Sequence, residues 1–406
     1  MLAFQLLQWF FWGLAITIAA PVLYLWLVSI SALLTARRQK DRGLSSSPPS
    51  RYTHFAILVP AHNEIAVLGN LLDSLNALEY PKAHFSVHVV ADNCTDATAD
   101  LARATGWAHV HERFDAEKRG KGYALSWLLK DLEDRQLIYD AYVVLDADSA
   151  VDSTFLLTMN SLLLQGARAL QARYTVLNAT ESPSTALRWF ALSLINYVRP
   201  LGRTGLGGSS TLTGNGMCFS RELLQQNPWQ AFSLTEDYQY YLTLVQRGER
   251  VRFVPEATVR SVMPVSFTSQ RTQDIRWEAN QGGQPQWKSA CRLLMAGVKK
   301  RDLVRLEAMA ELITPPLSIL VGCCLLTLIS SLLLWSLPPL LMSLLIIAGL
   351  TFYISTPMFL LRPPRVVYMA LLHAPGFMLW KIWVLLVMRK SKKHTGEWVR
   401  TSRGLS

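Results

Sequence analysis

Long apolar segments at both ends of this chain enclose a charged middle region, and this arrangement limits the folds open to it. Residues Trp9–Leu34 form a nearly uncharged apolar stretch, and a membrane span needs about 20 such residues. Ile313–Trp335 and Leu340–Leu361 have the same character nearer the other end. We therefore predict a membrane protein with three crossings, one before and two after a folded middle domain.

Basic residues cluster beside these apolar segments. The net charge is +11, and the densest basic runs are Arg37–Arg42, Lys299–Arg305 and Arg389–Lys393. Such flanks predict the cytoplasmic side and attract anionic lipid, so we expect membrane lipid as a partner and no nucleic acid. The middle domain is therefore expected on the cytoplasmic face of an integral membrane protein of the plasma (inner) membrane. Val366–Met388 is basic on both flanks, which favours a re-entrant or surface-lying segment.

From Tyr52 to Met263 short apolar runs alternate with helical patterns. Strands are expected at Phe55–Val59, Val87–Ala91 and Ala141–Leu145, and helices at Ile65–Leu78, Asp96–Thr105 and Gly122–Arg135. This alternation predicts an α/β fold with a mostly parallel sheet covered by helices on both faces. Ligands of such sheets bind outside the carboxyl ends of the strands.

Composition divides the chain into six segments. The stretch after the α/β region is amphipathic and rich in Arg, Lys and Trp, which is typical of helices that lie at a membrane surface. The expected segments are an N-terminal transmembrane helix (1–36), a basic linker (37–51), the α/β domain (52–263), amphipathic interfacial helices (264–306), C-terminal membrane segments (307–388) and a cytoplasmic basic tail (389–406).

An acidic pair, Asp146 and Asp148, directly follows the strand Ala141–Leu145. Two carboxylates at a sheet edge, together with water and phosphate oxygens, suit a hard octahedral cation such as Mg²⁺ or Mn²⁺. The same pair also occurs in ordinary surface turns, so its meaning depends on what surrounds it.

Three other segments of the α/β region carry candidate contacts to a nucleotide. Asn63 and Glu64 follow the first strand and either meet a base or ribose or begin a helix. Asp92 ends the second strand and either accepts a hydrogen bond from a uracil N–H or belongs to an Asp-Asn turn. Lys121 precedes Gly122 at the start of a helix, which suits a diphosphate or a solvated basic turn.

Two later turns contain candidate contacts to an acceptor, the molecule that would receive a sugar in a transfer reaction. Gly214 and Asn215 form a small-residue turn that lets an acceptor sugar approach the backbone, or that needs a positive φ. Glu236 and Asp237 begin a helical pattern. Asp237 is the candidate general base for an acceptor hydroxyl and Glu236 a candidate acceptor contact; the alternative is an acidic first helical turn.

Gln273, Arg276 and Trp277 share one face of an amphipathic stretch. Trp277 offers an apolar wall to a sugar or acceptor, and Arg276 offers a bidentate phosphate contact. The alternative is an interfacial helix with a Trp/Arg belt.

Taken in order, these motifs resemble the processive branch of family 2 glycosyltransferases, which includes cellulose, chitin, hyaluronan and poly-N-acetylglucosamine synthases. The matching positions are Asp92, Lys121-Gly122, Asp146 with Asp148, Thr235–Asp237, Gln273 with Arg276 and Trp277, and the tail Trp398–Arg403. The resemblance implies a GT-A (Rossmann-like) mixed-sheet catalytic domain, a UDP-sugar donor and membrane anchoring. Asn63, Glu64, Asp92, Lys121, Asp146, Arg276 and Trp277 are then the donor contacts, and Gly214, Asn215, Glu236, Gln273 and Trp277 the acceptor contacts.

The implied reaction is inverting transfer of a hexose or N-acetylhexosamine to a growing β-linked polysaccharide. Asp274 stands where many polymer synthases have Arg or Gln, and ceramide glucosyltransferase has a similar layout. Single transfer to a lipid such as a ceramide-like lipid, a polyprenyl phosphate or diacylglycerol is therefore the alternative. A non-catalytic sugar-nucleotide-binding membrane protein is a second alternative, which the intact acids argue against. The acceptor is a glycan or a lipid in the first two cases, and a homo-oligomer is compatible with all three.

Overall fold

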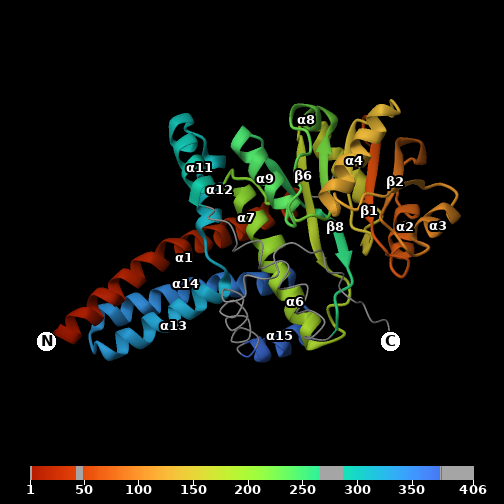
Figure 1. The fold of residues 1–406 in the computed structure, drawn as a ribbon. Coiled ribbons are helices and arrows are strands. Elements are labelled where there is room, and N and C mark those ends of the chain that lie inside the picture. The colour runs from red at the N-terminus through yellow and green to blue at the C-terminus, as the bar shows by residue number, and fades with distance from the viewer. Residues whose placement is uncertain (1, 43–48, 266–286, 375, 377–406) are drawn as a thin grey trace. The chain divides into compact units, whose positions relative to one another are not determined.

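The structure is a computed structural model that describes residues 2–42, 49–265, 287–374 and 376, and they form two compact units (Figure 1). Among the described residues, the first unit comprises 2–42, 193–208 and 287–376, and the second comprises 49–192 and 209–265. One internal segment of the expected α/β region, 193–208, therefore packs with the apolar helices of the first unit.

The second unit is a layered α/β domain around an eight-stranded sheet of order β3-β2-β1-β4-β7-β6-β8-β5. Its strands are β1 (Phe55–Ala61), β2 (Phe85–Asp92), β3 (His109–Arg113), β4 (Ala141–Val144), β5 (Ser149–Val151), β6 (Ala169–Val176), β7 (Met217–Ser220) and β8 (Val251–Ser261). Its helices are α2 (Leu68–Asn76), the 3-10 turn η1 (Lys82–His84), α3 (Thr98–Ala104), α4 (Lys121–Asp134), α5 (Phe155–Leu164), α6 (Pro183–Ser193), α8 (Arg221–Gln226) and α9 (Glu236–Arg247).

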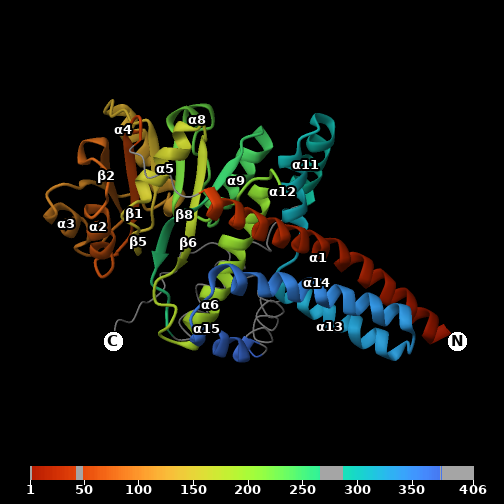
Figure 2. The same cartoon turned by 180° about the vertical axis from the view of Figure 1, so that it is seen from behind.

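The burial pattern explains why these segments adopt these structures. β1 is buried on both faces along almost its whole length, as expected for a central strand covered by helices. In α2 the buried residues recur at helical spacing and form one apolar stripe; they are Leu68, Leu71, Leu72 and Leu75. Leucines of α2 and α5 share one core with the inward side chains of β1 and β2, and the view from behind brings α5 to the front of the sheet (Figure 2).

Strand direction differs along the sheet. The strands β3, β2, β1 and β4 run parallel, as the alternating pattern predicted. β7 is antiparallel to both of its neighbours, β4 and β6, and β5 is antiparallel to β8. β6 and β8 run parallel to each other as well. The expectation of a mostly parallel sheet therefore holds for these two strands and for β3, β2, β1 and β4, and the expectation of a mixed sheet is confirmed. The direction of a later strand follows from its connection rather than from its own residues.

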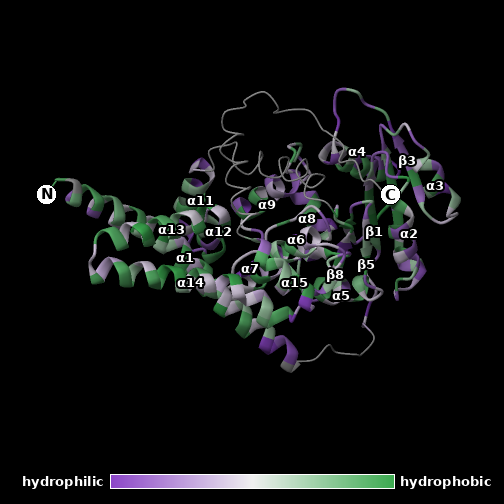
Figure 3. Cartoon of the chain, turned by 90° about the horizontal axis from the view of Figure 1, so that it is seen from below, coloured by the Kyte–Doolittle hydropathy of each residue, from purple (hydrophilic) through white to green (hydrophobic). Residues whose placement is uncertain are grey.

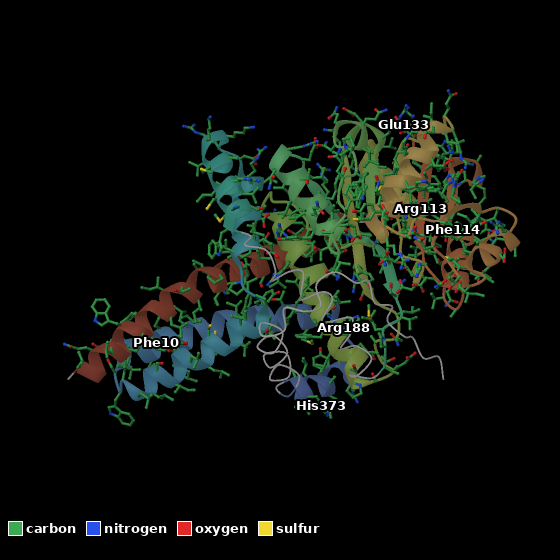
Figure 4. All side chains as sticks on the ribbon, viewed as in Figure 1. Phe10, Arg113, Phe114, Glu133, Arg188 and His373 are labelled. Atoms are coloured by element: carbon green, nitrogen blue, oxygen red, sulfur yellow. The ribbon has the colours of Figure 1, made fainter. Side chains whose placement is uncertain are left out.

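The first unit is helical. Its elements are α1 (Leu2–Arg42), the π-helical turn η2 (Leu194–Val198), α7 (Arg199–Gly205), α11 (Trp287–Lys300), α12 (Leu303–Ile313), α13 (Leu317–Leu333), α14 (Leu337–Leu361), α15 (Arg365–Ala370) and the 3-10 turn η3 (Leu371–His373). α1 and α14 are each long and apolar enough to cross a membrane, and Figure 3 colours much of both helices as hydrophobic. α1 also exposes large apolar side chains, Phe10 among them (Figure 4).

The expected span Ile313–Trp335 corresponds mainly to α13, and a break lies at its N-terminal end. α12 ends at Ile313 and α13 begins at Leu317, with a bend of 67° between the two helices. Thr314-Pro315-Pro316 separates them; proline lacks the N–H that would continue the helix and restricts the residue before it. Together the two helices could form a third crossing. The segment expected to lie at the surface, Val366–Met388, falls largely outside the described residues.

A buried polar network ties the helices of the first unit together. The Arg203 guanidinium of α7 is fully buried and donates to both carboxylate oxygens of Glu307 in α12, at 2.5 and 3.2 Å. Arg199 donates to Glu311 at 3.0 Å, and the Tyr24 hydroxyl of α1 lies 2.7 Å from the Glu307 carboxylate. Since each buried charge has an opposite partner, α7 is held between α1 and α12 at a defined register.

Candidate active site

The carboxyl ends of β1, β2 and β4 meet at one edge of the sheet because these strands are parallel neighbours. Asn63 lies two residues after β1, Asp92 is the last residue of β2, and Asp146 lies two residues after β4. The polar turns that were expected at the carboxyl edge of the sheet therefore lie together there.

Asn63 connects two of these turns. It has a positive φ of 55°, and its side-chain oxygen accepts hydrogen bonds from the backbone N–H groups of Thr95 and Asp96, at 2.7 and 3.2 Å. The backbone N–H of Glu64 donates to the Thr98 hydroxyl at 2.8 Å. The amide oxygen of Asn63 thus fixes the loop after β2, which is a structural task that the sequence interpretation did not include.

Asp92 is paired with a residue that the sequence analysis missed. The Arg113 guanidinium donates to Asp92 Oδ1 at 2.5 Å, and the two side chains are only 5% and 7% exposed. Arg113 also donates to Asp115 and to the carbonyl of Lys118, at 3.0 and 2.7 Å. Figure 4 labels this arginine beside the exposed Phe114. Arg113 faces Asp92 in the parallel register of β2 and β3, and no local pattern reveals that register.

Lys121, at the start of α4, lies at the centre of the remaining acids. Its ammonium is 2.5 Å from Asp146 Oδ1 and 3.7 Å from Glu236 Oε1, and it donates to the carbonyl of Gly214 at 2.6 Å. Burial opposes the charged form of Lys121, but the neighbouring carboxylates, Asp146 first, raise its pKa. The lysine therefore stays protonated and holds three turns of the chain together.

Gly122 lies where two segments of the chain approach each other closely. A Cβ at this position would lie 2.1 Å from the carbonyl oxygen of Ala231 and 3.3 Å from Cβ of Glu236. The absence of a side chain at Gly122 thus makes room for the segment before α9. This contact brings Glu236 toward Lys121.

Asp237 and Glu236 occupy the first turn of α9. The pKa of both carboxyls is raised, because burial disfavours their charged form more than the Lys121 ammonium favours it. Asp237 Oδ1 accepts a hydrogen bond from the backbone N–H of Tyr238 at 2.7 Å. Asp237 Oδ2 lies 3.1 Å from the position that a Cβ of Gly214 would take. Gly214 has a φ of +77°, which fits the expected need of this turn for a positive φ. The small turn and the candidate base therefore lie side by side.

Asn215 lies beneath the acidic pair rather than at its surface. Its side chain is fully buried; its oxygen accepts from the backbone N–H of Asp146 at 3.2 Å, and its nitrogen donates to the Ser149 hydroxyl at 2.7 Å. The Ser149 and Ser261 hydroxyls in turn lie 3.4 Å from Asp148 Oδ1. The Asn215 side chain therefore positions the Asp146 turn, and its expected contact with an acceptor stays a prediction.

Asp146 and Asp148 present the oxygen ligands that Mg²⁺ and Mn²⁺ prefer. Within residues 2–42, 49–265 and 287–374, no three His, Cys, Asp or Glu side chains are grouped to hold a metal ion. A cation here would take its remaining ligands from phosphate oxygens and water, which fits the two-carboxylate set. Gln273, Arg276 and Trp277 lie outside the described residues.

Comparison with known proteins identifies the family. Residues 51–280 match the model of the family described as glycosyltransferase like family 2. The chain is 34% identical over 188 residues to a beta-monoglucosyldiacylglycerol synthase of Nostoc sp. (strain PCC 7120 / SAG 25.82 / UTEX 2576), covering 45% of this chain and 39% of that protein. It is 23% identical over 241 residues to glucomannan 4-beta-mannosyltransferase 1 of Cyamopsis tetragonoloba, covering 56% and 45%. The chain thus aligns with less than half the length of either relative.

Among solved structures, the mannosyltransferase PcManGT from Pyrobaculum calidifontis, in complex with GDP-Man and Mn²⁺, is similar with a TM-score of 0.48 and 18% identity. The match covers 83% of this chain and 96% of that one. The family match carries the assignment, since it spans more than half of the chain and contains the described sheet edge with its acids. The chain therefore belongs to glycosyltransferase-like family 2, and its mixed α/β sheet agrees with the expected GT-A fold.

Proposed function

We propose that the enzyme transfers a single hexose from a UDP-sugar to the hydroxyl of a membrane lipid, with diacylglycerol as the acceptor class, and inverts the anomeric centre. The observation that carries the transfer chemistry is the convergence of Asp146, Lys121 and Asp237 at the carboxyl edge of the sheet. The lipid acceptor is supported by the similarity to the diacylglycerol glucosyltransferase of Nostoc and by the apolar helices of the first unit.

The donor nucleotide is assigned to the turn after β2. Asp92 accepts a hydrogen bond from the uracil N–H, and Arg113 orients its carboxylate through the 2.5 Å contact. Asn63 and Glu64 support this turn from the end of β1. Because Asp92 ends a buried strand, its carboxylate sits on a rigid base rather than on a loop.

The donor diphosphate is assigned to the acidic pair and Lys121. Asp146 and Asp148 hold a Mg²⁺ or Mn²⁺ ion, which when bound neutralises charge that develops on the departing diphosphate. The Lys121 ammonium, 2.5 Å from Asp146, keeps that carboxylate in place and adds positive charge at the same edge. Arg276 and Trp277 are assigned to the donor as well, and Gln273 and Trp277 to the acceptor.

Asp237 is assigned as the general base. It accepts the proton of the acceptor hydroxyl while that oxygen forms a bond to the anomeric carbon, and the bond from this carbon to the UDP oxygen breaks. Attack from the face opposite UDP converts an α-linked donor into a β-linked product. Burial raises the pKa of Asp237, which brings its basicity nearer to working pH and improves proton transfer.

The test is an Asp237→Asn variant assayed with UDP-glucose and diacylglycerol vesicles. Transfer should be abolished while UDP binding, measured by calorimetry, is retained. Asp73→Asn, a change at an exposed acid of α2, serves as the control and should keep full activity. Turnover that survives in Asp237→Asn would remove Asp237 from the base role.

A second candidate is polymer synthesis. The Gln273, Arg276 and Trp277 motif and the similarity to a glucomannan mannosyltransferase favour growth of a β-linked polysaccharide. Product length separates the two functions: a single glycolipid supports lipid transfer, and a ladder of chain lengths supports a polymer.

We place the catalytic domain on the cytoplasmic side of the plasma (inner) membrane, because Arg37, Arg38 and Lys40 follow the apolar part of α1.

A further inference from the structure

A buried network of polar side chains lies beneath Asp148. Its members come from β5, β6, β8 and the turn before β7, and each is at most 1% exposed; they are Ser149, Gln171, Ser261 and Asn215. Polar groups removed from water cost free energy unless they are hydrogen-bonded. Four of them gathered beside one carboxylate therefore need a reason in the fold or in the chemistry.

The amide of Asn215 has a defined orientation in this network. One of its two terminal atoms lies 3.2 Å from the backbone nitrogen of Asp146. A backbone N–H group only donates, so that atom is the oxygen, and the amide nitrogen faces the other way. This nitrogen lies 2.7 Å from the Ser149 hydroxyl and 3.4 Å from the Ser261 hydroxyl. Asn215 therefore donates hydrogen bonds toward the two serines.

Gln171 holds the backbone of Asn215 from the side of β6. Its side-chain nitrogen donates to the carbonyl of Asn215 at 2.8 Å, and its oxygen accepts from the backbone N–H of Thr213 at 3.0 Å. Both sides of the turn at Gly214 are thus fixed to the sheet. A shift of Asn215 would break buried hydrogen bonds, which is costly, so its amide keeps one position.

The two serines connect this amide to Asp148. Ser149 and Ser261 are directly opposite each other on the antiparallel strands β5 and β8. Their hydroxyl oxygens lie 3.1 Å apart, and each lies 3.4 Å from Oδ1 of Asp148. The amide nitrogen at one end of this chain only donates, and an ionised carboxylate at the other end only accepts. The hydroxyl protons therefore point from Asn215 toward Asp148.

We propose that Ser149 and Ser261 are positioning residues that orient the Asp148 carboxylate for a divalent cation. Both act through Asp148, and hydrogen bonds to a ligand carboxylate typically contribute about 10- to 100-fold to metal affinity. The inference rests on the proposed function, in which Asp148 is a metal ligand. The competing role for the pair is structural: it joins β5, the last strand in the sheet order, to β8.

The test measures Mn²⁺ binding rather than activity. The purified full chain in detergent is titrated with Mn²⁺ in the presence of UDP, and the electron paramagnetic resonance signal of free Mn²⁺ reports the unbound ion. The double variant Ser149→Ala/Ser261→Ala should raise the Kd for Mn²⁺ by about 10- to 100-fold. Ser86→Ala is the matched control, because this half-buried serine lies at the opposite, amino end of β2. It should leave the Kd unchanged.

Thermal unfolding without metal separates positioning from folding. Each single variant, Ser149→Ala or Ser261→Ala, leaves one hydroxyl beside Asp148, so each should stay folded and weaken Mn²⁺ binding less than the double variant does. An unchanged Kd in the folded double variant would overturn the inference and leave the pair with the structural role alone. If the double variant does not fold, an unchanged Kd in both single variants would overturn it equally.

An Asp148→Ala variant distinguishes this inference from the function on which it rests. Loss of Mn²⁺ binding in Asp148→Ala, with binding retained in the serine variants, would show that only the positioning role is wrong. Mn²⁺ binding in Asp148→Ala as tight as in the unmodified chain would show that the proposed metal role of Asp148 is itself wrong.

Discussion

Lys121 Nζ lies 2.5 Å from Asp146 Oδ1, and the same ammonium lies 3.7 Å from Glu236 Oε1. One cation therefore serves acids from two segments that lie far apart in the sequence. It also contacts the carbonyl of Gly214, beside the candidate base Asp237. This lysine links the half of the site assigned to the donor diphosphate with the half assigned to the acceptor.

Replacing Lys121 by Met should therefore impair catalysis more than folding. The loss of a charge-assisted contact worth about 1.5–3 kcal/mol predicts roughly 10- to 100-fold lower kcat/KM. Removing the ammonium also removes the interaction that lowers the pKa of Asp237. The base then stays protonated to higher pH, so the acidic limb of the pH–rate profile should move upward. Lys130→Met is the control, and an unchanged profile in Lys121→Met would separate this lysine from the base.

Gly122→Ala should disturb the site through the backbone. The new methyl group would lie 2.1 Å from the carbonyl oxygen of Ala231, so the segment before α9 must move, at a cost of about 1–3 kcal/mol. Glu236 moves with it, and kcat should fall. Gly69→Ala in α2, where nothing lies within 4 Å, should be neutral or stabilising by up to about 1 kcal/mol. Thermal unfolding in detergent and steady-state kinetics measure both effects; equal behaviour of the two variants would contradict the contact.

Arg113→Met should leave the Asp92 carboxylate without its charged partner. Both side chains are buried, and removing one member of a buried ion pair costs about 3–5 kcal/mol. The KM for the UDP-sugar should rise at the same time, because Asp92 loses its orientation. Arg103→Met removes only exposed ion pairs and should cost about 1 kcal/mol or less. A donor KM that does not change in Arg113→Met would detach Asp92 from the nucleotide.

We expect His88 to make the free energy of unfolding of the second unit depend on pH. The His88 side chain is buried. Its Nδ1 lies 3.1 Å from Nε2 of His111, and its own Nε2 lies 2.8 Å from the Tyr139 hydroxyl. The Asp131 carboxylate accepts a hydrogen bond from Nδ1 of His111 at 2.8 Å. Burial, reinforced by His111, lowers the pKa of His88 to about 3. The unfolded chain takes up this proton near pH 6.5, so stability should fall as the pH drops below about 6.5, by up to about 1.4 kcal/mol per pH unit.

Thermal unfolding midpoints between pH 7.5 and 5 test this linkage. His88→Gln can keep hydrogen bonds to both neighbours but binds no proton, so its midpoint should depend less on pH than that of the unmodified chain. Equal slopes for the two proteins would assign the acid sensitivity to other groups.

Much of the architecture was readable from local patterns. The sequence predicts a strand at Phe55–Val59 and a helix at Ile65–Leu78, and both elements are present as β1 and α2, with ends shifted by up to three residues. The placement of Asp92 and Asp146 at one edge followed from a general rule for parallel strands. These predictions succeeded because the hydrophobic pattern that indicates a buried strand or helix is formed by residues close together in the sequence.

By itself, the sequence determined which segments are apolar enough for a membrane, which form the first parallel strands, and which acids follow them. Only the tertiary structure decided that Arg113 faces Asp92, that Asn215 lies beneath the Asp146 turn, and that Lys121 joins Asp146 to Glu236. Those pairings depend on strand order, register and the close approach of backbones at Gly122. They are set by contacts between residues distant in the chain, and no local pattern of hydrophobicity or charge encodes them.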